Sequence, residues 1–422
     1  MEKYLIKPPT SNFIKGTIYL NGSKSISNRV LIINALCRNQ IEIENLSNAD
    51  DTVFMQQLLQ SESTVLDAGA GGTTFRFLTA FLATQEGCEV VLTGSERMQL
   101  RPIKILVNAL QQLGADISYE NKDGFPPLKI KGKKLKGGNV TLPADTSSQY
   151  ITALLLIAPT LENGLELELI GTIVSFPYIK MTLKIMEYFG VETSFVDNKI
   201  VVRSGNYQPK KYYVEADWSA ATYFYSIAIL SEQAEIELKG LTNQQLQGDA
   251  IIAAIADSFG VETTWNENAI VLNKVRKPDF GLYNFDFIEC PDIAQTVITF
   301  CAASSIEMNC GGLQTLRIKE TDRIAALDNE LKKLKLASLT EIDSNHWQLS
   351  LDMTTTNDSH HSHHSHHTTS IATYEDHRMA MAFAPLCLKT KSILIEEPNV
   401  VAKSYPLFWN DLKKLGFSVQ TI

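Results

Sequence analysis

The sequence contains no apolar run long enough to cross a membrane as a helix. Its longest apolar stretch, residues 151–161, falls short of the roughly 18 residues that a spanning helix requires. Residues 1–9 (MEKYLIKPP) form neither the apolar core of a signal peptide nor an Arg- and Ser-rich transit pattern. We therefore expect a protein with no membrane partner that is located in the cytoplasm.

Basic charge is also scarce, because the formal net charge is −9 at pH 7. A general nucleic-acid binder carries a basic excess, so we expect no nucleic-acid partner. Any site for anions must be a local concentration of Lys and Arg on an acidic body. The sequence has no Gly-x4-Gly-Lys-Ser/Thr spacing, which excludes the usual phosphate-binding loop of nucleotide hydrolases.

Paired cysteines are missing as well. The sequence has six cysteines and no Cys-x-x-Cys spacing, and most of them lie in apolar surroundings. That pattern predicts buried thiols in a reducing compartment rather than disulfides. The cysteines are Cys37, Cys88, Cys290, Cys301, Cys310 and Cys387, of which Cys88 lies within a predicted strand.

The chain contains an internal repeat. Residues 186–202 (MEYFGVETSFVDNKIVV) and 256–272 (ADSFGVETTWNENAIVL) each read as a helix end, a Gly stop, a strand, a turn and a second strand. The same Gly stop recurs at Gly114 and Gly416, and Lys335 occupies it in a weaker copy. The copies follow one another at roughly 70–80 residues, as in proteins built from repeated modules. Six α/β units fit a chain of 422 residues, the first of them ending near Leu59.

Short β-rich runs alternate with helical patterns throughout, which predicts an α/β protein. At this length two domains are the expectation. No long Pro- and Gly-rich linker separates two halves, so we expect short hinges near residues 20–22 and 215–218. Four of the predicted strands are residues 89–93, 166–170, 234–238 and 392–396.

One low-complexity segment, residues 354–370 (TTTNDSHHSHHSHHTTS), holds six of the eight histidines. Clustered imidazoles bind zinc, nickel or copper, so a metal site is one interpretation. The segment also lacks apolar residues to bury, which is typical of an insertion without a packed structure. We expect the insertion and predict no metal site.

The stretch with the most chemical content is residues 318–327 (IKETDRIAAL). Thr321 or Asp322 can serve as the N-cap of a helix in which apolar residues then recur at helical spacing. A helix start favours an anionic ligand, and Lys319, Glu320 and Arg323 would add charge and a group that moves protons. Alone, such a stretch is more often a capped, solvated helix start with local ion pairs.

Other basic residues occur at further predicted helix entrances, several beside Gly, Ser or Asn. Asp292 also precedes a predicted helix, where it could be only an acid that favours the helix start. Each entrance alone is ordinary, but together the basic residues predict a large cleft for small polyanionic molecules. They are Lys24, Arg29, Arg76, Arg97, Lys319, Arg323, Arg378 and Lys403.

Four motifs in this order carry a resemblance to the 5-enolpyruvylshikimate-3-phosphate synthases. They are residues 22–29 (GSKSISNR), 97–102 (RMQLRP), 319–323 (KETDR) and 376–380 (DHRMA). The resemblance implies a two-domain enolpyruvyl transferase-like fold, an inside-out α/β barrel of six βαβαββ-like units with the ligands in a cleft between the domains. The first domain would be residues 1–20 plus 217–422, with the His-rich insertion 354–370, and the second residues 21–216.

The implied reaction moves the enolpyruvyl group of phosphoenolpyruvate to the 5-hydroxyl of shikimate 3-phosphate by addition and elimination, releasing phosphate. It is a step of the shikimate pathway to chorismate and aromatic amino acids, and glyphosate mimics phosphoenolpyruvate. The resemblance implies two small-molecule substrates, no cofactor and no metal, and we expect a monomer. Asp292 would accept a proton, and Glu320 with Lys24 would manage the vinyl proton.

The resemblance also assigns the binding residues, some of them to both substrates. Those for shikimate 3-phosphate would be Lys24, Ser25, Arg29, Ser147, Ser148, Gln149, Ser175, Tyr178, Asp292, Thr315 and Lys319. Those for phosphoenolpyruvate would be Lys24, Gly72, Arg97, Gln149, Arg323, Arg378 and Lys403.

Three residues depart from the family's pattern. Ala70 stands where the family usually has Asn, Phe77 where it has Pro, and Thr315 where it has Asn. These departures bear on affinity and inhibitor response more than on the reaction.

Two rival functions remain. The sister enzyme that acts on UDP-N-acetylglucosamine carries a Cys in the loop that corresponds to residues 95–101, where this chain has none. A catalytically silent metal-binding protein on this fold would rest on the His-rich tract alone, and it is disfavoured because Asp292, Glu320 and Lys24 are all present.

Overall fold

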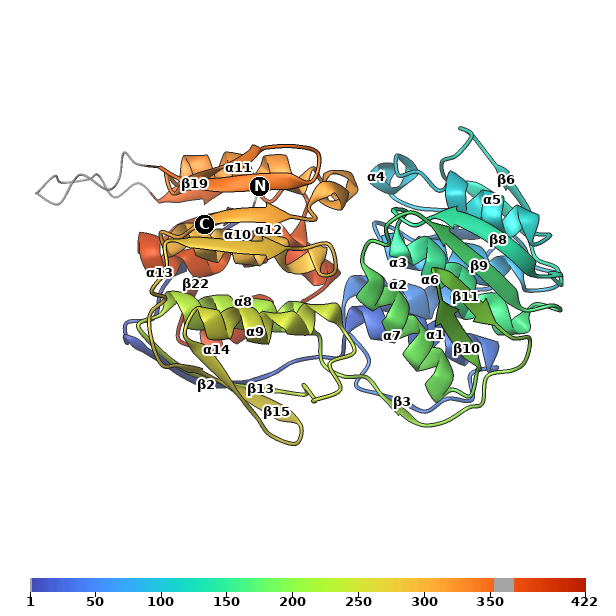
Figure 1. The fold of residues 1–422 in the computed structure, drawn as a ribbon, viewed down its shortest axis with the longest axis horizontal. Helices are drawn as coiled ribbons and strands as arrows, with labels where there is room; N and C mark the ends of the chain where they lie inside the picture. The colour runs from blue at the N-terminus through green and yellow to red at the C-terminus, as the bar shows by residue number, and fades with distance from the viewer. Residues whose placement is uncertain (1, 353–367) are drawn as a thin grey trace, which may run out of the picture. The chain divides into compact units, whose positions relative to one another are not determined.

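The computed structural model describes residues 2–352 and 368–422 and divides into two compact units (Figure 1). The first unit consists of the chain up to Asn21 and of Ala216–Ile422, and the second of Gly22–Glu215. The chain therefore leaves the first unit once and returns to it once. Residues 354–367 of the His-rich tract lie outside the described residues. The predicted insertion ends too late, because strand β20 (Thr369–Ile371) already begins within it.

One strand order recurs in both units. In the second unit a four-stranded sheet has the order β4-β5-β7-β6, in which β4 and β5 are parallel and β7 is antiparallel to both its neighbours. A helix follows each of the first two strands, so the chain order is strand, helix, strand, helix, strand, strand. The elements are β4 (Val65–Asp67), α3 (Gly72–Ala83), β5 (Glu89–Thr93), α4 (Glu96–Gln99), α5 (Lys104–Gln112), β6 (Asp116–Tyr119) and β7 (Leu128–Lys131).

A second sheet of this unit and one sheet of the first unit repeat that order and those strand directions. In the second unit they are β8 (Gly138–Pro143), α6 (Ser148–Ile157), β9 (Leu165–Ile170), α7 (Phe176–Tyr188), β10 (Thr193–Val196) and β11 (Lys199–Val202). In the first unit they are β16 (Leu282–Asp286), α10 (Ala294–Ala303), β17 (Glu307–Gly311), α11 (Arg323–Lys333), β18 (Ala337–Glu341) and β19 (His346–Leu351).

Two more sheets of the first unit keep the order although their strands come from distant parts of the chain. Strand β2 is parallel to β13, which follows only after the whole second unit, and β1 completes the last sheet between β21 and β22. Both chain ends therefore lie in the first unit (Figure 1). The elements are β1 (Lys3–Lys7), β2 (Phe13–Tyr19), α8 (Trp218–Leu230), β13 (Gln233–Lys239), α9 (Ile252–Ser258), β14 (Val261–Trp265), β15 (Ala269–Lys274), β20, α12 (His377–Phe383), β21 (Ile393–Glu396), α14 (Phe408–Lys414) and β22 (Ser418–Thr421).

The remaining repeat, which is the first in the sequence, is reduced. It consists of α1 (Lys24–Leu36), β3 (Ile43–Glu44) and α2 (Asp50–Leu59), and β3 pairs in parallel with the distant strand β12 (Tyr212–Tyr213). Helix α2 ends at Leu59, where the weakest copy was expected to end. The predicted α/β class with repeated βαβαββ-like units is confirmed.

The stops between helix and hairpin share one backbone conformation. Gly114, Gly190, Gly260 and Gly416 all have a positive φ, between 80° and 105°. Lys335, which stands in the fifth copy, has a φ of 54° and takes the same left-handed region. The repeat therefore keeps its geometry where the sequence has lost its glycine, at a steric penalty that glycine would avoid.

Helices occupy the interior of each repeat set and sheets cover them. Every residue of α10 is buried, and so is every residue of α8 except Ser219. The strands instead alternate between buried and exposed positions, as β8 and β9 do, so that one face of each sheet meets solvent. This arrangement is the inside-out α/β packing that the sequence predicts.

The cysteines are free thiols, and five of the six are buried. Cys88 is half-buried and lies immediately before β5, so its predicted place within a strand is wrong. Across residues 2–352 and 368–422 the structure contains no helix that is both long enough and apolar enough to span a bilayer.

Candidate functional site

The first unit gathers four cations and three carboxylates, most of them near the starts of its helices, and we call this group the acid–base cluster. Its members come from four stretches of chain far apart in the sequence. In sequence order the members are Asp292, Lys319, Glu320, Arg323, Asp376, Arg378 and Lys403, and each forms an ion pair with at least one other. Six of the seven are predicted site residues, and the structure brings them together.

Arg323 lies at the centre of the acid–base cluster. It is the first residue of α11, whose N-cap is Asp322, because the Asp322 carboxylate accepts from the amides of Ile324 and Ala325 at 3.1 Å. The guanidinium is 2% exposed and donates to Asp376 at 2.7 Å and to Glu320 at 2.9 Å. A fork of five N–H donors suits several carboxylates at once, so Arg323 orders the acids around it.

Asp292 faces three cations. Its carboxylate lies 3.0 Å from Arg378, 3.5 Å from Arg323 and 3.6 Å from Lys319. Burial alone would raise the pKa of Asp292, but these three positive charges hold it well below its usual range. Asp292 is therefore an ionised carboxylate at neutral pH, within reach of groups that bind anions.

Glu320 lies between two cations. It accepts from Lys403 at 2.7 Å and from Arg323 at 2.9 Å. Lys403 is the last residue of the short helix η7 (Pro398–Lys403), so its predicted place at a helix entrance is wrong. The lysine reaches the cluster from a helix end, because its long side chain can extend away from that end to Glu320.

A further buried carboxyl group, Asp249, belongs to the same neighbourhood. It has no exposed surface, and the Ser219 hydroxyl donates to it. Burial, and then the negative charge of Asp292, raise the pKa of Asp249 to about 7, although Arg378 opposes this. The group was missed from the sequence because a Gly-Asp pair before an apolar helix is an ordinary helix start.

In the second unit the N-terminal ends of four helices meet. Lys24, the first residue of α1, donates to Asp51 of α2 at 3.1 Å. Thr74 of α3 donates to the backbone oxygen of Asp51 at 2.8 Å, and Arg76 of α3 donates to Gln149 of α6 at 3.0 Å. Helices α1, α2, α3 and α6 also pack as neighbours (Figure 1). Their positive dipole ends therefore point into one region, which favours anions.

Gly72 allows two guanidinium groups to approach the start of α3. A Cβ atom on Gly72 would lie 2.6 Å from a terminal nitrogen of both Arg76 and Arg101. Arg76 also donates to the Gly72 oxygen at 2.9 Å, and Gln149 donates to the Thr73 hydroxyl at 2.9 Å. Gly72 is therefore needed because it lets the two guanidinium groups approach, and not because a turn requires glycine there.

Arg29 is buried among neutral acceptors. It donates to the hydroxyls of Thr182 at 2.8 Å and Thr152 at 3.2 Å, and to the backbone oxygens of Ser25 and Tyr178. Burial lowers the pKa of Arg29 to about 9, which still leaves the guanidinium charged at neutral pH. A buried cation held only by neutral groups is suited to an anionic ligand.

Other predicted site residues also lie at helix starts. Ser147 is the N-cap of α6, and its hydroxyl accepts from the Gln149 amide at 3.4 Å, while Ser148 is the first residue of that helix. Ser175 precedes α7 in a left-handed conformation. Arg97 lies exposed on α4. Thr315 lies in the short helix η4 (Gln314–Ile318), where its buried hydroxyl has no partner in the structure.

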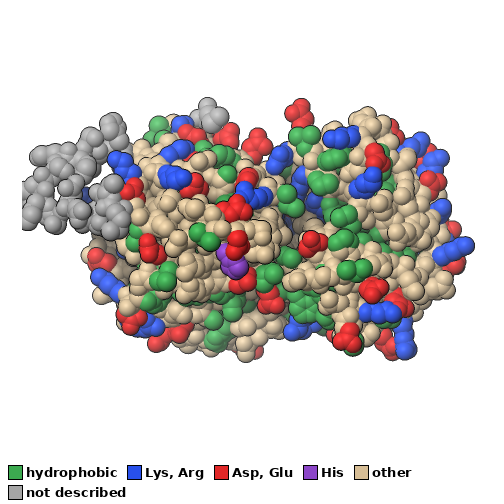
Figure 2. All heavy atoms as spheres, turned by 45° about the horizontal axis from the view of Figure 1, so that its top comes forward, with side chains coloured by type: hydrophobic (Ala, Val, Ile, Leu, Met, Phe, Trp, Pro, Cys, Tyr) green, Lys and Arg blue, Asp and Glu red, His purple; other side chains and the backbone are tan. Residues whose placement is uncertain are grey.

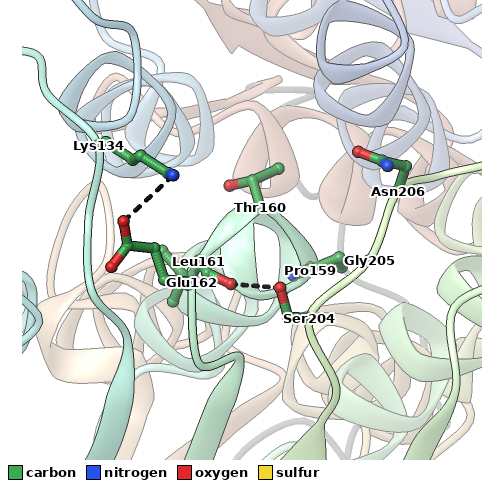
Figure 3. Close-up of a pocket in the computed structure, with 8 residues that line it drawn as sticks. All are labelled: Lys134, Pro159, Thr160, Leu161, Glu162, Ser204, Gly205 and Asn206. Atoms are coloured by element: carbon green, nitrogen blue, oxygen red, sulfur yellow. Dashed lines mark hydrogen bonds and ion pairs between the residues drawn. The ribbon is translucent and has the colours of Figure 1, made fainter.

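The cavity drawn in Figure 3, about 460 Å³, contains none of the predicted site residues. Its two charged residues, Lys134 and Glu162, pair with each other at 3.2 Å, and Ser204 donates to the Leu161 oxygen. The two charged groups of this cavity are therefore paired with each other, and the helix starts, which hold the predicted site residues, remain the better site. Figure 2 shows acidic and basic side chains interspersed over the visible face. In the part of the chain that the structure describes, no group of three His, Cys, Asp or Glu residues could hold a metal ion.

The fold of the chain is shared with solved structures. Two solved structures of EPSP synthase from Acinetobacter baumannii share it at 20% sequence identity. One has a TM-score of 0.77 and covers 100% of both chains, and the other has a TM-score of 0.74 and covers 99% of both. The structural class is therefore that of the EPSP synthases.

Sequence comparison then gives the family. The family model for EPSP synthase (3-phosphoshikimate 1-carboxyvinyltransferase) matches residues 9–61 and 53–412. The 3-phosphoshikimate 1-carboxyvinyltransferase of Bacteroides fragilis (strain YCH46) is 47% identical over 99% of both chains. That of Haemophilus influenzae (strain KW20) is 33% identical over 98% of this chain and 99% of its own length. The chain belongs to the EPSP synthase family, and the predicted family, fold class and enzyme class are confirmed.

Proposed function

We propose that the protein transfers the enolpyruvyl group of phosphoenolpyruvate to the 5-hydroxyl of shikimate 3-phosphate, the reaction for which its family is named. In the addition step the 5-hydroxyl oxygen bonds to C2 of phosphoenolpyruvate, its proton leaves to a base, and C3 takes up a proton. In the elimination step C3 loses a proton and phosphate departs, which restores the double bond. Both steps need a base, an acid and cations that stabilise the charged intermediate.

Asp292 is the base for the 5-hydroxyl in this proposal. Its ionised state and its place in the acid–base cluster support the role. With the site empty, the three nearby cations make Asp292 a weak base, because they stabilise its charged form. Anionic substrates that bind Arg378, Lys319 and Arg323 would offset those charges and raise the basicity of Asp292 when it is needed.

In this proposal Glu320 and Lys24 are the groups that deliver the proton to C3 of phosphoenolpyruvate and remove a proton from it again. Glu320 lies 2.7 Å from Lys403 and 2.9 Å from Arg323, two cations that an anionic ligand would also attract. Lys24 lies 3.1 Å from Asp51, which pairs with its ammonium group when no anion is bound. The groups that move the vinyl proton therefore lie in ion pairs for which anionic substrates can compete.

Each unit supplies its own set of binding groups. In the first unit we assign Arg323, Arg378 and Lys403 to phosphoenolpyruvate, and Asp292, Thr315 and Lys319 to shikimate 3-phosphate. In the second unit we assign Gly72, Arg97 and Gln149 to phosphoenolpyruvate and Lys24 to both substrates. The remaining groups for shikimate 3-phosphate are Ser25, Arg29, Ser147, Ser148, Gln149, Ser175 and Tyr178.

The observation that carries the proposal is the acid–base cluster, in which Asp292 and Glu320 share a buried arginine with Asp376. The test is to offer the purified chain phosphoenolpyruvate with shikimate 3-phosphate or with UDP-N-acetylglucosamine, each with and without a chelator. We expect phosphate release with shikimate 3-phosphate alone, unchanged by the chelator. Turnover of the sugar nucleotide would instead indicate the sister activity, and loss of activity with chelator would indicate a metal enzyme.

We further propose that the enzyme works as a monomer in the cytoplasm. Six free thiols, five of them buried, support a reducing compartment. Sedimentation of the full chain at micromolar concentration tests the monomer, and a mass near twice 47.0 kDa would contradict it.

A further inference from the structure

Helix α11 holds one segment, residues 372–376, at two points. Arg323 and Glu330 are seven residues apart, so they lie two turns apart on the same face of the helix. Arg323 donates to Asp376 at 2.7 Å. Glu330 accepts from the Tyr374 hydroxyl at 2.6 Å and from the Ala372 amide at 3.3 Å.

The backbone between these two points is strained. Tyr374 and Glu375 have φ values of 54° and 56°, so two successive residues with side chains take the left-handed region. Such conformations persist only where the surrounding contacts hold them in place. Glu330 supplies two of those contacts, one to the side chain of Tyr374 and one to the backbone just before it.

The strained turn leads directly into the acid–base cluster. Asp376 follows Glu375 and caps α12 by accepting from the Arg378 amide at 2.8 Å. The guanidinium of Arg378 then lies 3.0 Å from Asp292. The direction in which the chain leaves the turn therefore sets the positions of both Asp376 and Arg378.

Glu330 itself is a buried carboxylate whose charge is fully paired. It has no exposed side-chain surface, and Lys333 donates to both of its oxygens, at 2.7 and 2.9 Å. Burial of a charged group is unfavourable unless it is paired and hydrogen-bonded. An apolar residue would fill this position more readily, so the carboxylate indicates that its contacts to the turn matter.

We propose that Glu330 and Tyr374 are positioning residues, which hold the strained turn so that Asp376 and Arg378 meet Arg323 and Asp292 in the geometry of the reaction. The inference rests on the proposed function, in which Arg323 and Arg378 bind phosphoenolpyruvate. Neither Glu330 nor Tyr374 touches a substrate in this scheme. Their effect reaches phosphoenolpyruvate only through the two arginines.

The test compares Tyr374→Phe, Glu330→Gln and their combination in the full chain, with steady-state kinetics for each substrate. We expect each single variant to raise KM for phosphoenolpyruvate at least about fivefold, since small misplacements of binding groups weaken catalysis strongly. KM for shikimate 3-phosphate should change much less. The double variant should be no worse than the worse single variant, because both act through one contact.

Asp328→Asn provides a matched control on the same helix. Asp328 also pairs with a lysine, Lys332 at 2.7 Å, and accepts one backbone amide, that of Leu339 at 2.9 Å, but this amide belongs to β18. We expect Asp328→Asn to lower the melting temperature without changing KM for phosphoenolpyruvate. A purely structural role for Glu330 would give the same pattern in Glu330→Gln.

The proposal is overturned if Tyr374→Phe folds and keeps the KM for phosphoenolpyruvate of the parent protein. If Glu330→Gln fails to fold, Tyr374→Phe decides alone, because it removes one hydroxyl from a half-buried ring. Failure of the proposed function is a different result, since the unmodified protein would then show no turnover of shikimate 3-phosphate.

Discussion

The guanidinium of Arg378 lies 3.0 Å from the carboxylate of Asp292. Arg378 belongs to the start of α12, and Asp292 lies in the short helix η3 (Pro291–Ile293) that precedes α10. Arg323 and Lys319 approach the same carboxylate, which holds the pKa of Asp292 well below its usual range. The base of the proposed reaction is thus ionised before substrate arrives. Its strength depends on how far bound anions offset the three cations.

Replacing Asp292 with Asn tests this role. The amide keeps the shape of the carboxylate but cannot accept a proton, so kcat should fall by roughly 10²-fold or more, as for loss of a general base. Both anionic substrates should still bind, because one negative charge has left a site that attracts anions. Steady-state kinetics with calorimetry would measure both effects. Turnover close to that of the parent protein would remove Asp292 from the mechanism.

The unpartnered hydroxyl of Thr315 gives a second prediction. A buried hydroxyl without a partner is unfavourable in the empty protein, so Thr315→Val should keep or raise the melting temperature. The same change should raise KM for shikimate 3-phosphate by about five- to tenfold, since a hydrogen bond to the ligand is lost. Thr315→Asn, which restores the residue usual in the family, should keep KM for shikimate 3-phosphate within a few-fold of the value of the parent protein.

Thr299→Val is the matched control for that pair. The Thr299 hydroxyl is buried but has acceptors, because it can donate to the backbone oxygen of Thr296 at 2.9 Å or to that of Ala382 at 3.2 Å. Its removal should lower the melting temperature and leave both KM values unchanged. The assignment of Thr315 to substrate fails if Thr315→Val behaves in the same way as this control.

Much of the fold could be predicted from the sequence because the repeat is local. Each helix end, its left-handed stop and the following hairpin lie within about 20 residues, so hydrophobic periodicity and turn residues indicate them. The pairing of β1 with β21 could not be predicted, because nothing in Lys3–Lys7 indicates a partner almost 400 residues later. Long-range pairing is decided by packing of the whole unit.

Gly72 provides a third prediction. Gly72→Ala should fold, because φ at Gly72 is not positive and the atoms nearest to the added Cβ belong to the flexible ends of Arg76 and Arg101. Both guanidinium groups must move to admit the methyl group, so KM for phosphoenolpyruvate should rise by about tenfold while KM for shikimate 3-phosphate changes little. Gly205→Ala, whose Cβ meets nothing within 4 Å, is the control and should change neither. Equal behaviour of the two variants would contradict the role of Gly72.

Asp249 predicts how stability depends on pH. Its pKa of about 7 in the folded protein is higher than the ordinary value near 4 that it has when unfolded. Between these values the folded protein holds a proton that the unfolded chain releases, so the free energy of unfolding falls as pH rises from about 4 to 7. Asn cannot ionise, and its oxygen can still accept from Ser219. In Asp249→Asn the free energy of unfolding should therefore not show this fall with rising pH.

Thermal melts at several pH values between 4 and 8 would measure the effect. The melting temperature of Asp249→Asn should exceed that of the parent protein by a margin that grows by roughly 2–4 °C between pH 4 and pH 7. Asp279→Asn, at an exposed position, is the control and should show no growing margin. A constant margin for Asp249→Asn across the range would show that Asp249 does not take up a proton in the folded protein.

The site was predictable where a motif combines a helix start with charge, as in residues 319–323 and 376–380. The partners of those motifs were not. Asp51 and Asp249 read locally as ordinary acids at helix starts, and only the packing of helices far apart in the sequence brings them beside Lys24 and Asp292. Thr321 and Asp322 were equal candidates for the N-cap of α11, and the hydrogen bonds to Asp322 decide between them.

The last prediction separates the His-rich tract from the strand that follows it. Replacing residues 354–367 with a Gly/Ser linker of equal length should leave turnover and melting temperature nearly unchanged, because the replaced sequence has no apolar side chain to bury. Extending the replacement to residue 370 should lower the melting temperature. It would remove the first two residues of β20, including Ser370, whose hydroxyl donates to Glu396 at 2.7 Å. Loss of activity in the shorter replacement, or turnover that requires added zinc, would favour a metal-binding role for the tract.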